Sequence, residues 1–71
     1  MNMTGFHLVE TPSDAVFAAY LRRHGAIDTI FAGEHGELWL NGNETTVAVV
    51  FRYGGQSPVV WIPAGQTMKG E

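Results

Sequence analysis

The chain has 71 residues, of which 45% are hydrophobic and 15% charged, with a net charge of −3 and no cysteine. This length suits a single domain over residues 1–71, and the lack of cysteine excludes disulfides and thiolate metal sites. Because a secreted domain this small would usually carry disulfides, we expect a cytoplasmic location. The basic residues form no stripe of the kind that binds nucleic acid, and neither a signal peptide nor a membrane-spanning run is present, so we expect neither nucleic acid nor membrane as a partner.

The N-terminal part of the sequence predicts a short strand followed by a helix. Residues 5–10 read as a strand, most simply an edge strand. Thr11 is then a candidate N-cap, because a proline follows it at the first helical position and Asp14 lies three residues after it. Gly25 supplies a stop signal. We therefore predict a helix over about residues 12–24.

Four strand-like runs follow, at about residues 26–32, 37–41, 45–53 and 58–63, separated by short segments rich in turn-forming residues. Together with the first strand, they predict an α+β fold. One helix should pack on one face of a four- to five-stranded, mainly antiparallel sheet, in the order β-α-β-β-β-β with a C-terminal meander.

Short hairpin loops allow the strand residues to be assigned to two faces. With four-residue loops at 33–36 and 54–57, we expect the helix to cover an almost wholly apolar face. Its residues are Ile27, Phe31, Leu38, Leu40, Val47, Val49, Phe51, Val60 and Ile62. The second face is mixed and consists of Asp28, Ile30, Trp39, Thr46, Ala48, Val50, Arg52, Val59 and Trp61. A loop error of one residue would exchange the faces of a strand.

The second face is the candidate functional surface, because it holds both tryptophans and one helix can cover only one face. An ordinary solvated face would be polar, and tryptophan with arginine is typical of interface hot spots. The expected partner-binding residues are Ile30, Trp39, Val50, Arg52, Val59 and Trp61. Alternatively, the N-terminal strand or residues 64–66 could fold over this face.

No pattern in the sequence predicts catalysis, a cofactor or a metal. His7, His24 and His35 lack metal-ligand spacing. Glu34, His35 and Glu37 could hold an ion with help from elsewhere, but a solvated hairpin loop explains them more simply. Nucleophile and phosphate-loop motifs are absent. We therefore expect no enzyme activity and no bound cofactor.

The first functional hypothesis is a non-enzymatic protein-binding module that acts through a sheet face or edge. Its partner would be another protein or its own copy, in a homodimer or a heteromeric complex. Size, charge and layout are shared with many small phage or mobile-element proteins, so an anti-defence inhibitor of a larger host complex is the most concrete version. The alternative is a homodimeric small-ligand-binding protein or enzyme subunit. Its site would lie between protomers, where the tryptophans and Arg52 stack on or grip a ligand.

Overall fold

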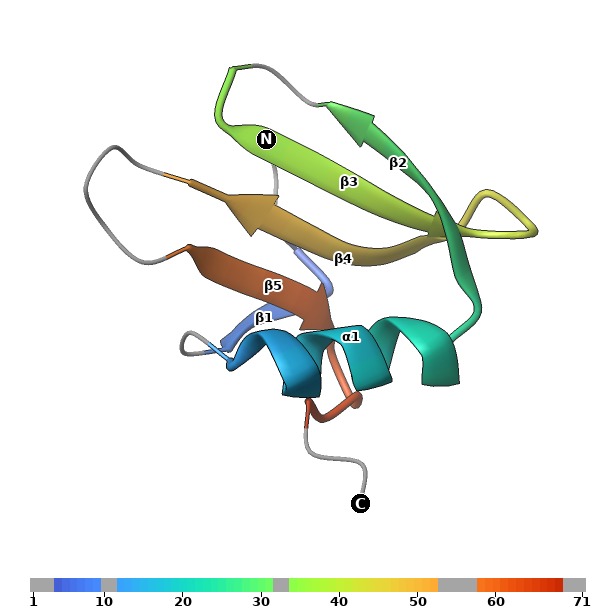
Figure 1. Cartoon of the computed structure of the whole chain (residues 1–71), viewed down its shortest axis with the longest axis horizontal. Coiled ribbons are helices and arrows are strands. Elements are labelled where there is room, and N and C mark those ends of the chain that lie inside the picture. The colour runs from blue at the N-terminus through green and yellow to red at the C-terminus, as the bar shows by residue number, and fades with distance from the viewer. Residues whose placement is uncertain (1–3, 10–11, 32–33, 53–57, 69–71) are drawn as a thin grey trace.

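The computed structural model describes residues 4–9, 12–31, 34–52 and 58–68. It contains one helix and five strands: β1 (Phe6–Val9), α1 (Asp14–Arg23), β2 (Ala26–Phe31), β3 (Gly36–Asn41), β4 (Thr46–Phe51) and β5 (Val59–Pro63). The strands form one sheet in the order β1-β5-β4-β3-β2, and every neighbouring pair is antiparallel (Figure 1). The predicted α+β fold with a C-terminal meander is therefore confirmed.

Helix α1 begins two residues after the predicted start. Its N-cap is Ser13, whose hydroxyl accepts a 3.2 Å hydrogen bond from the Val16 N–H. The prediction that Thr11 caps the helix is wrong, because Ser13 takes that position; Thr11 itself lies outside the described residues. At the other end, Gly25 adopts a positive φ of 69° directly after the C-cap His24, as the predicted stop signal requires.

The position of the helix follows from the connection between the two edge strands. Because the successive sheet neighbours are antiparallel, β1 and β2 run in the same direction although they lie at opposite edges. Helix α1 crosses in front of the sheet between them, and this crossover is right-handed (Figure 1). Parallel strands in one sheet are joined this way in almost all proteins. The hand of the crossover therefore determines which face the helix covers.

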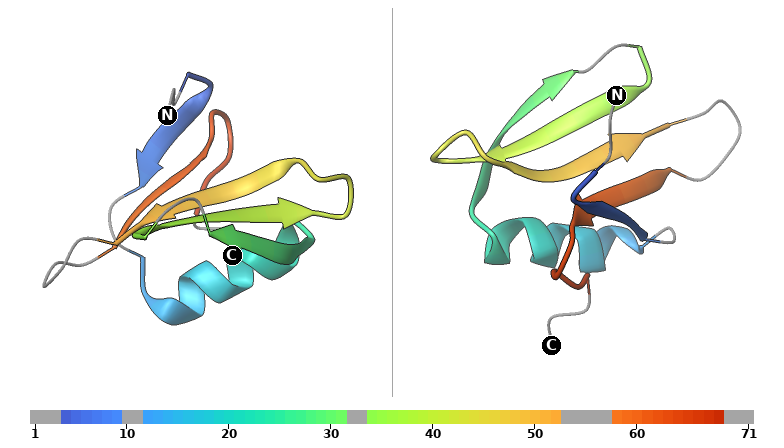
Figure 2. Two further views of the ribbon diagram at one scale, coloured as in Figure 1. Left: turned by 90° about the horizontal axis from the view of Figure 1, so that it is seen from above. Right: turned by 180° about the vertical axis from the view of Figure 1, so that it is seen from behind.

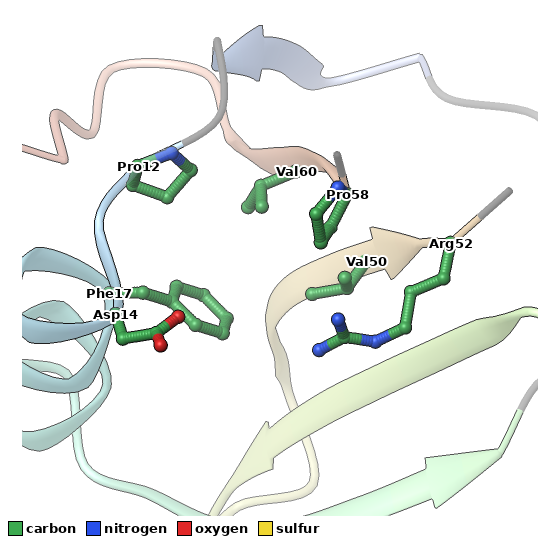
Figure 3. Close-up of a pocket in the computed structure, with 7 residues that line it drawn as sticks. All are labelled: Pro12, Asp14, Phe17, Val50, Arg52, Pro58 and Val60. Carbon is green, nitrogen blue, oxygen red and sulfur yellow. The ribbon is translucent and has the colours of Figure 1, made fainter. Parts of the chain in front are cut away.

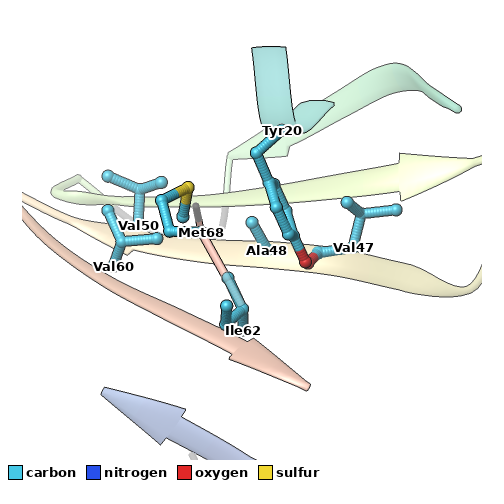
Figure 4. Close-up of a cluster of buried hydrophobic side chains, with 7 residues drawn as sticks. All are labelled: Tyr20, Val47, Ala48, Val50, Val60, Ile62 and Met68. Atoms are coloured by element: carbon cyan, nitrogen blue, oxygen red, sulfur yellow. The ribbon is translucent and has the colours of Figure 1, made fainter. Parts of the chain in front are cut away.

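The core lies between this helix and the sheet (Figure 4). It consists of Tyr20, Val47, Ala48, Val50, Val60, Ile62 and Met68. Tyr20 is 1% exposed, and its hydroxyl donates a 2.8 Å hydrogen bond to the Val47 carbonyl, so the one phenol in the core is satisfied.

The segment after β5 joins the helix side of the molecule. Met68 packs into the core, and the Arg23 guanidinium donates to the Thr67 and Met68 carbonyls at 3.4 Å. The His7 Nε2 lies 2.8 Å from the Gln66 carbonyl oxygen. The alternative that residues 64–66 fold over the face opposite the helix is therefore wrong.

Two predicted hairpin registers differ from the structure by one residue. Val50 pairs with Val60 instead of Trp61. Ile30 pairs with Leu38 instead of Trp39, because the last pair before the loop is Phe31–Glu37, which leaves five residues in the loop instead of the predicted four. The middle hairpin keeps Trp39 and Ala48 on one face, as predicted, with a bulge after that pair. The predicted loop at 54–57 lies outside the described residues.

These shifts correct the prediction of what α1 covers. The helix packs on the face of Trp39, Ala48 and Val50, together with Val60 and Ile62. The helix was expected over Leu38, Leu40, Val49 and Phe51, but the registers place these four side chains on the opposite face.

Candidate interaction surface

The sheet face opposite α1, here named the open face, is assembled from all five strands. The pairs Leu8–Trp61, Trp61–Val49, Val49–Leu38 and Leu38–Ile30 run across it from edge to edge. By strand alternation the open face comprises Phe6, Leu8, Asp28, Ile30, Gly36, Leu38, Leu40, Thr46, Val49, Phe51, Val59, Trp61 and Pro63. Asp28 is the one charged residue in this set.

The open face is partly accessible to solvent. Leu8 is 51% exposed and Ile30 47% exposed, at opposite edges, whereas Leu40 and Val49 in the centre are buried. Figure 2 shows α1 on the other side of the sheet, and in the described ranges no second layer of secondary structure lies over the open face. A solvated sheet face is normally polar. The composition of this face is instead that of a surface that packs against something.

The open face contains three of the six predicted partner-binding residues. Ile30, Val59 and Trp61 lie on it. Trp39, Val50 and Arg52 do not, which corrects the prediction that the six share one face. Val50 is 1% exposed and belongs to the core. The physical reason is the one-residue shift between β4 and β5, which pairs Val50 with Val60 instead of Trp61. It places the two tryptophans on opposite faces.

Trp39 and Arg52 are instead held together by a carboxylate on the helix-covered face. The Glu37 carboxylate accepts a 3.3 Å hydrogen bond from Trp39 Nε1. It also forms an ion pair with Arg52, whose Nε lies 2.9 Å from the carboxylate oxygen. The Trp39 ring meets the Phe17 ring edge to face, with centroids 6.2 Å apart. Both residues therefore have local structural roles. A ligand site built from both tryptophans and Arg52 is not assembled within one chain.

Among the described residues, two clefts flank the helix, and both are smaller than a typical ligand pocket. The first, about 80 Å³, lies between the start of α1 and the adjoining ends of β4 and β5, with Asp14 and Arg52 facing each other across it (Figure 3). Its lining residues are Pro12, Asp14, Phe17, Val50, Arg52, Pro58 and Val60. The second, about 250 Å³, adjoins His24 and Gln66. Ligand pockets usually measure about 300–1,000 Å³.

The titratable groups in the part of the chain that the structure describes offer no cluster of metal ligands. No group of three or more His, Asp or Glu side chains converges there as metal ligands would. His35 and Glu34 lie 3.8 Å apart and are exposed. Burial raises the pKa of Tyr20, against the opposing effect of the Arg23 charge, so the phenol stays protonated at neutral pH.

Several residues of the open face were missed at the sequence level. Leu38, Leu40, Val49 and Phe51 were assigned to the core under the helix, and Leu8 was assigned to no face. The pairing of β1 with β5 would have revealed them, because it fixes the crossover and with it the side of the helix.

No described helix is long and apolar enough to cross a membrane.

Comparisons of the chain with protein-family models, with curated proteins and with solved structures find no match.

Proposed function

We propose that the protein is a non-enzymatic binding module that docks its open face onto the surface of another protein. The observation that carries the proposal is the apolar open face, spanning five strands, with Leu8 and Ile30 half exposed. Docking would remove from water the apolar side chains at the edges of this face, and this burial favours association.

The chemistry of the open face indicates the chemistry of its partner. The centre is apolar and includes Trp61, a residue type that often anchors interfaces. Its charged residue is Asp28, in edge strand β2, and the whole chain carries a net charge of −3. A complementary partner surface has an apolar centre with a basic side chain at its rim. Inhibition of a larger host complex and a cytoplasmic location are sequence-based predictions compatible with this proposal.

The test compares one open-face variant with one helix-surface variant. Leu8→Lys places a charge on the open face, and Ala15→Lys places the same charge on the exposed side of α1. Both substitutions are at accessible positions, so both proteins should fold, which circular dichroism checks. We expect a partner purified with the wild-type protein to bind Ala15→Lys normally and Leu8→Lys at least tenfold more weakly.

The tryptophans provide a second readout of the same binding. In Trp39→Phe, Trp61 is the sole tryptophan. Its emission should shift to shorter wavelength when the purified partner is added, because docking removes water from the indole. Equal affinity of the two lysine variants, together with unchanged Trp61 emission, would show that the partner uses another surface.

A further inference from the structure

The outer strand β2 concentrates exposed apolar side chains. Ile27 is 74% exposed, Ile30 47% and Phe31 78%, and these are three of the four exposed large hydrophobic residues among those that the structure describes. β2 also lies at one edge of the sheet, so one row of its backbone groups has no neighbouring strand among the described residues. An apolar edge strand with free backbone groups is a template for pairing with another chain.

The hydrogen-bond pattern shows which backbone groups of β2 face outward. The Arg52 N–H donates to the His35 carbonyl at 2.7 Å, so by antiparallel alternation Glu37 and Trp39 also direct their backbone groups to β4. Leu38 then turns its groups to β2, where its partner is Ile30. Consequently the backbone N–H and C=O of Ile30 point toward β3. Those of its neighbours Thr29 and Phe31 point outward, away from the sheet.

A side-chain contact supports this orientation of Thr29 independently. The Thr29 N–H donates a 2.8 Å hydrogen bond to the carboxylate of the preceding Asp28. An amide directed into the β2–β3 ladder could not do so with good geometry. The outward row of β2 therefore presents the N–H and C=O of Thr29 and Phe31. One of these donors, the Thr29 N–H, is bonded to the Asp28 carboxylate.

We propose that two copies of the chain associate through antiparallel pairing of β2 with β2, on a two-fold axis at Ile30. In this register Thr29 of each copy lies opposite Phe31 of the other. The Phe31 N–H donates to the Thr29 carbonyl, and the Thr29 N–H exchanges the Asp28 carboxylate for the Phe31 carbonyl. Ile30 meets Ile30 of the second copy on the open face. Ile30 is thereby buried against its counterpart on the open face, and Phe31 packs beside Thr29 of the second copy on the other face.

The neighbouring register, centred on Thr29, fits less well. It would place the Asp28 carboxylate opposite the apolar Ile30 of the second copy. It would also pair Phe31 with Ile27, where the β2–β3 ladder is already interrupted between Ala26 and Asp28. Like-charged Asp28 side chains lie further apart along the strand in the register centred on Ile30. The axis at Ile30 therefore uses the regular part of the strand.

The association extends the sheet instead of stacking two sheets. The two-fold axis stands perpendicular to the sheet, so both helices lie on one side and the two open faces adjoin on the other. The dimer edge is distinct from the open-face surface proposed above, although Ile30 contributes to both. Docking to another protein and dimerisation can consequently be tested separately.

The first experiment measures molar mass by light scattering over a range of concentrations. We expect the wild-type chain to dimerise, and both Thr29→Pro, which removes an outward donor, and Phe31→Lys, which charges the edge, to weaken association at least tenfold. Asp28→Ala should strengthen it, because it frees the Thr29 N–H and removes a repulsive charge. Ala15→Lys, on the exposed side of α1, is the matched control and should dimerise like wild type.

Circular dichroism separates loss of association from loss of folding in these variants. Phe31→Lys keeps the test decisive if Thr29→Pro fails to fold, since Phe31 is the most exposed of the large apolar side chains described. A wild-type chain that is monomeric at all concentrations would overturn the proposal. Folded Phe31→Lys protein that dimerises as tightly as wild type would overturn it equally.

The second experiment tests the register by cysteine scanning. The chain contains no cysteine, so Thr29→Cys, Ile30→Cys and Phe31→Cys each introduce a unique thiol. Opposed residues of a non-hydrogen-bonded antiparallel pair have Cα atoms about 4.5 Å apart, which permits a disulfide. We expect Ile30→Cys to form the disulfide-linked dimer at least tenfold faster than the other two. Fastest linking by Thr29→Cys would overturn the register.

Discussion

The helix-covered face and the open face of the sheet are built from similar side chains but meet different surroundings. Each holds one tryptophan and several aliphatic residues from the central strands. On the covered face, Tyr20 and Met68 complete a core, and the Glu37 carboxylate accepts hydrogen bonds from Trp39 Nε1 and Arg52 Nε. On the open face, Leu8 and Ile30 are half exposed. Hydrophobicity alone therefore does not show which face a single helix covers.

The largest expected difference is between Ile62 on the covered face and Leu8 on the open face. Ile62 is fully buried, so Ile62→Ala should lower the free energy of unfolding by about 2–5 kcal/mol. Leu8→Ala, at a half-exposed position of the adjacent strand, should cost about 1 kcal/mol or less. Urea unfolding of both variants measures the difference. Equal losses would mean that the two faces are equally packed.

The second prediction concerns the hydroxyl in the core. Tyr20→Phe should lower the free energy of unfolding by about 1–3 kcal/mol, because the Val47 carbonyl loses its donor while staying buried. A loss no greater than that of an exposed substitution would indicate that water reaches this carbonyl and that the covered face is less well sealed.

The same tyrosine predicts a pH dependence. Burial raises the folded-state pKa of Tyr20 above the ordinary value of 10.0, so its contribution is complete below pH 10.0 and is lost as the pH rises through the folded-state pKa. Urea midpoints across the alkaline range should fall more steeply for wild type than for Tyr20→Phe. Parallel curves for the two proteins would contradict the inferred burial of the phenol.

The helix cap gives a smaller effect. Ser13→Ala removes the hydroxyl that accepts from the Val16 N–H and should cost about 1 kcal/mol. Thermal or urea unfolding detects this, and Ser13→Asp, which can still cap, is the matched control. If Ser13→Ala were neutral, the helix would not depend on this cap to stay over the covered face.

The smallest effect is expected from the ion pair at the end of the covered face. Arg52→Ala should change the free energy of unfolding by about 0.5 kcal/mol or less, because the Arg52 side chain is 54% exposed and solvent screens the pair. The change should diminish further in high salt. A loss of several kcal/mol in urea unfolding would show that Arg52 contributes through packing and not through charge.

The local features of the fold were predictable from the sequence, whereas its long-range geometry was not. The helix, the Gly25 stop and β1 as an edge strand follow from propensity and spacing. The side of the helix depends on the pairing of β1 with β5, across more than fifty residues of chain. The sequence Phe6–Val9 has apolar residues at both parities, so its pattern suits either face.

Half of the candidate surface was misassigned for a related reason. The side-chain period of a strand is two, so a one-residue shift in register exchanges the faces of neighbouring strands. Pairing Ile30 with Leu38 instead of Trp39 does this to β2 relative to β3, and pairing Val50 with Val60 instead of Trp61 does it to β5 relative to β4. Glycine-rich turns accept loops of four or five residues, and the sequence does not distinguish them. Trp39 therefore lies under the helix and Trp61 on the open face, where the sequence pattern had placed both together.

The central claim is that the open face is the docking surface, and hydroxyl-radical footprinting of the free protein and of its partner complex tests it most directly. Docking should protect Leu8, Phe51 and Trp61 and leave the exposed residues of α1 as reactive as in the free protein. Protection confined to α1, with Leu8 and Trp61 unchanged, would contradict the account.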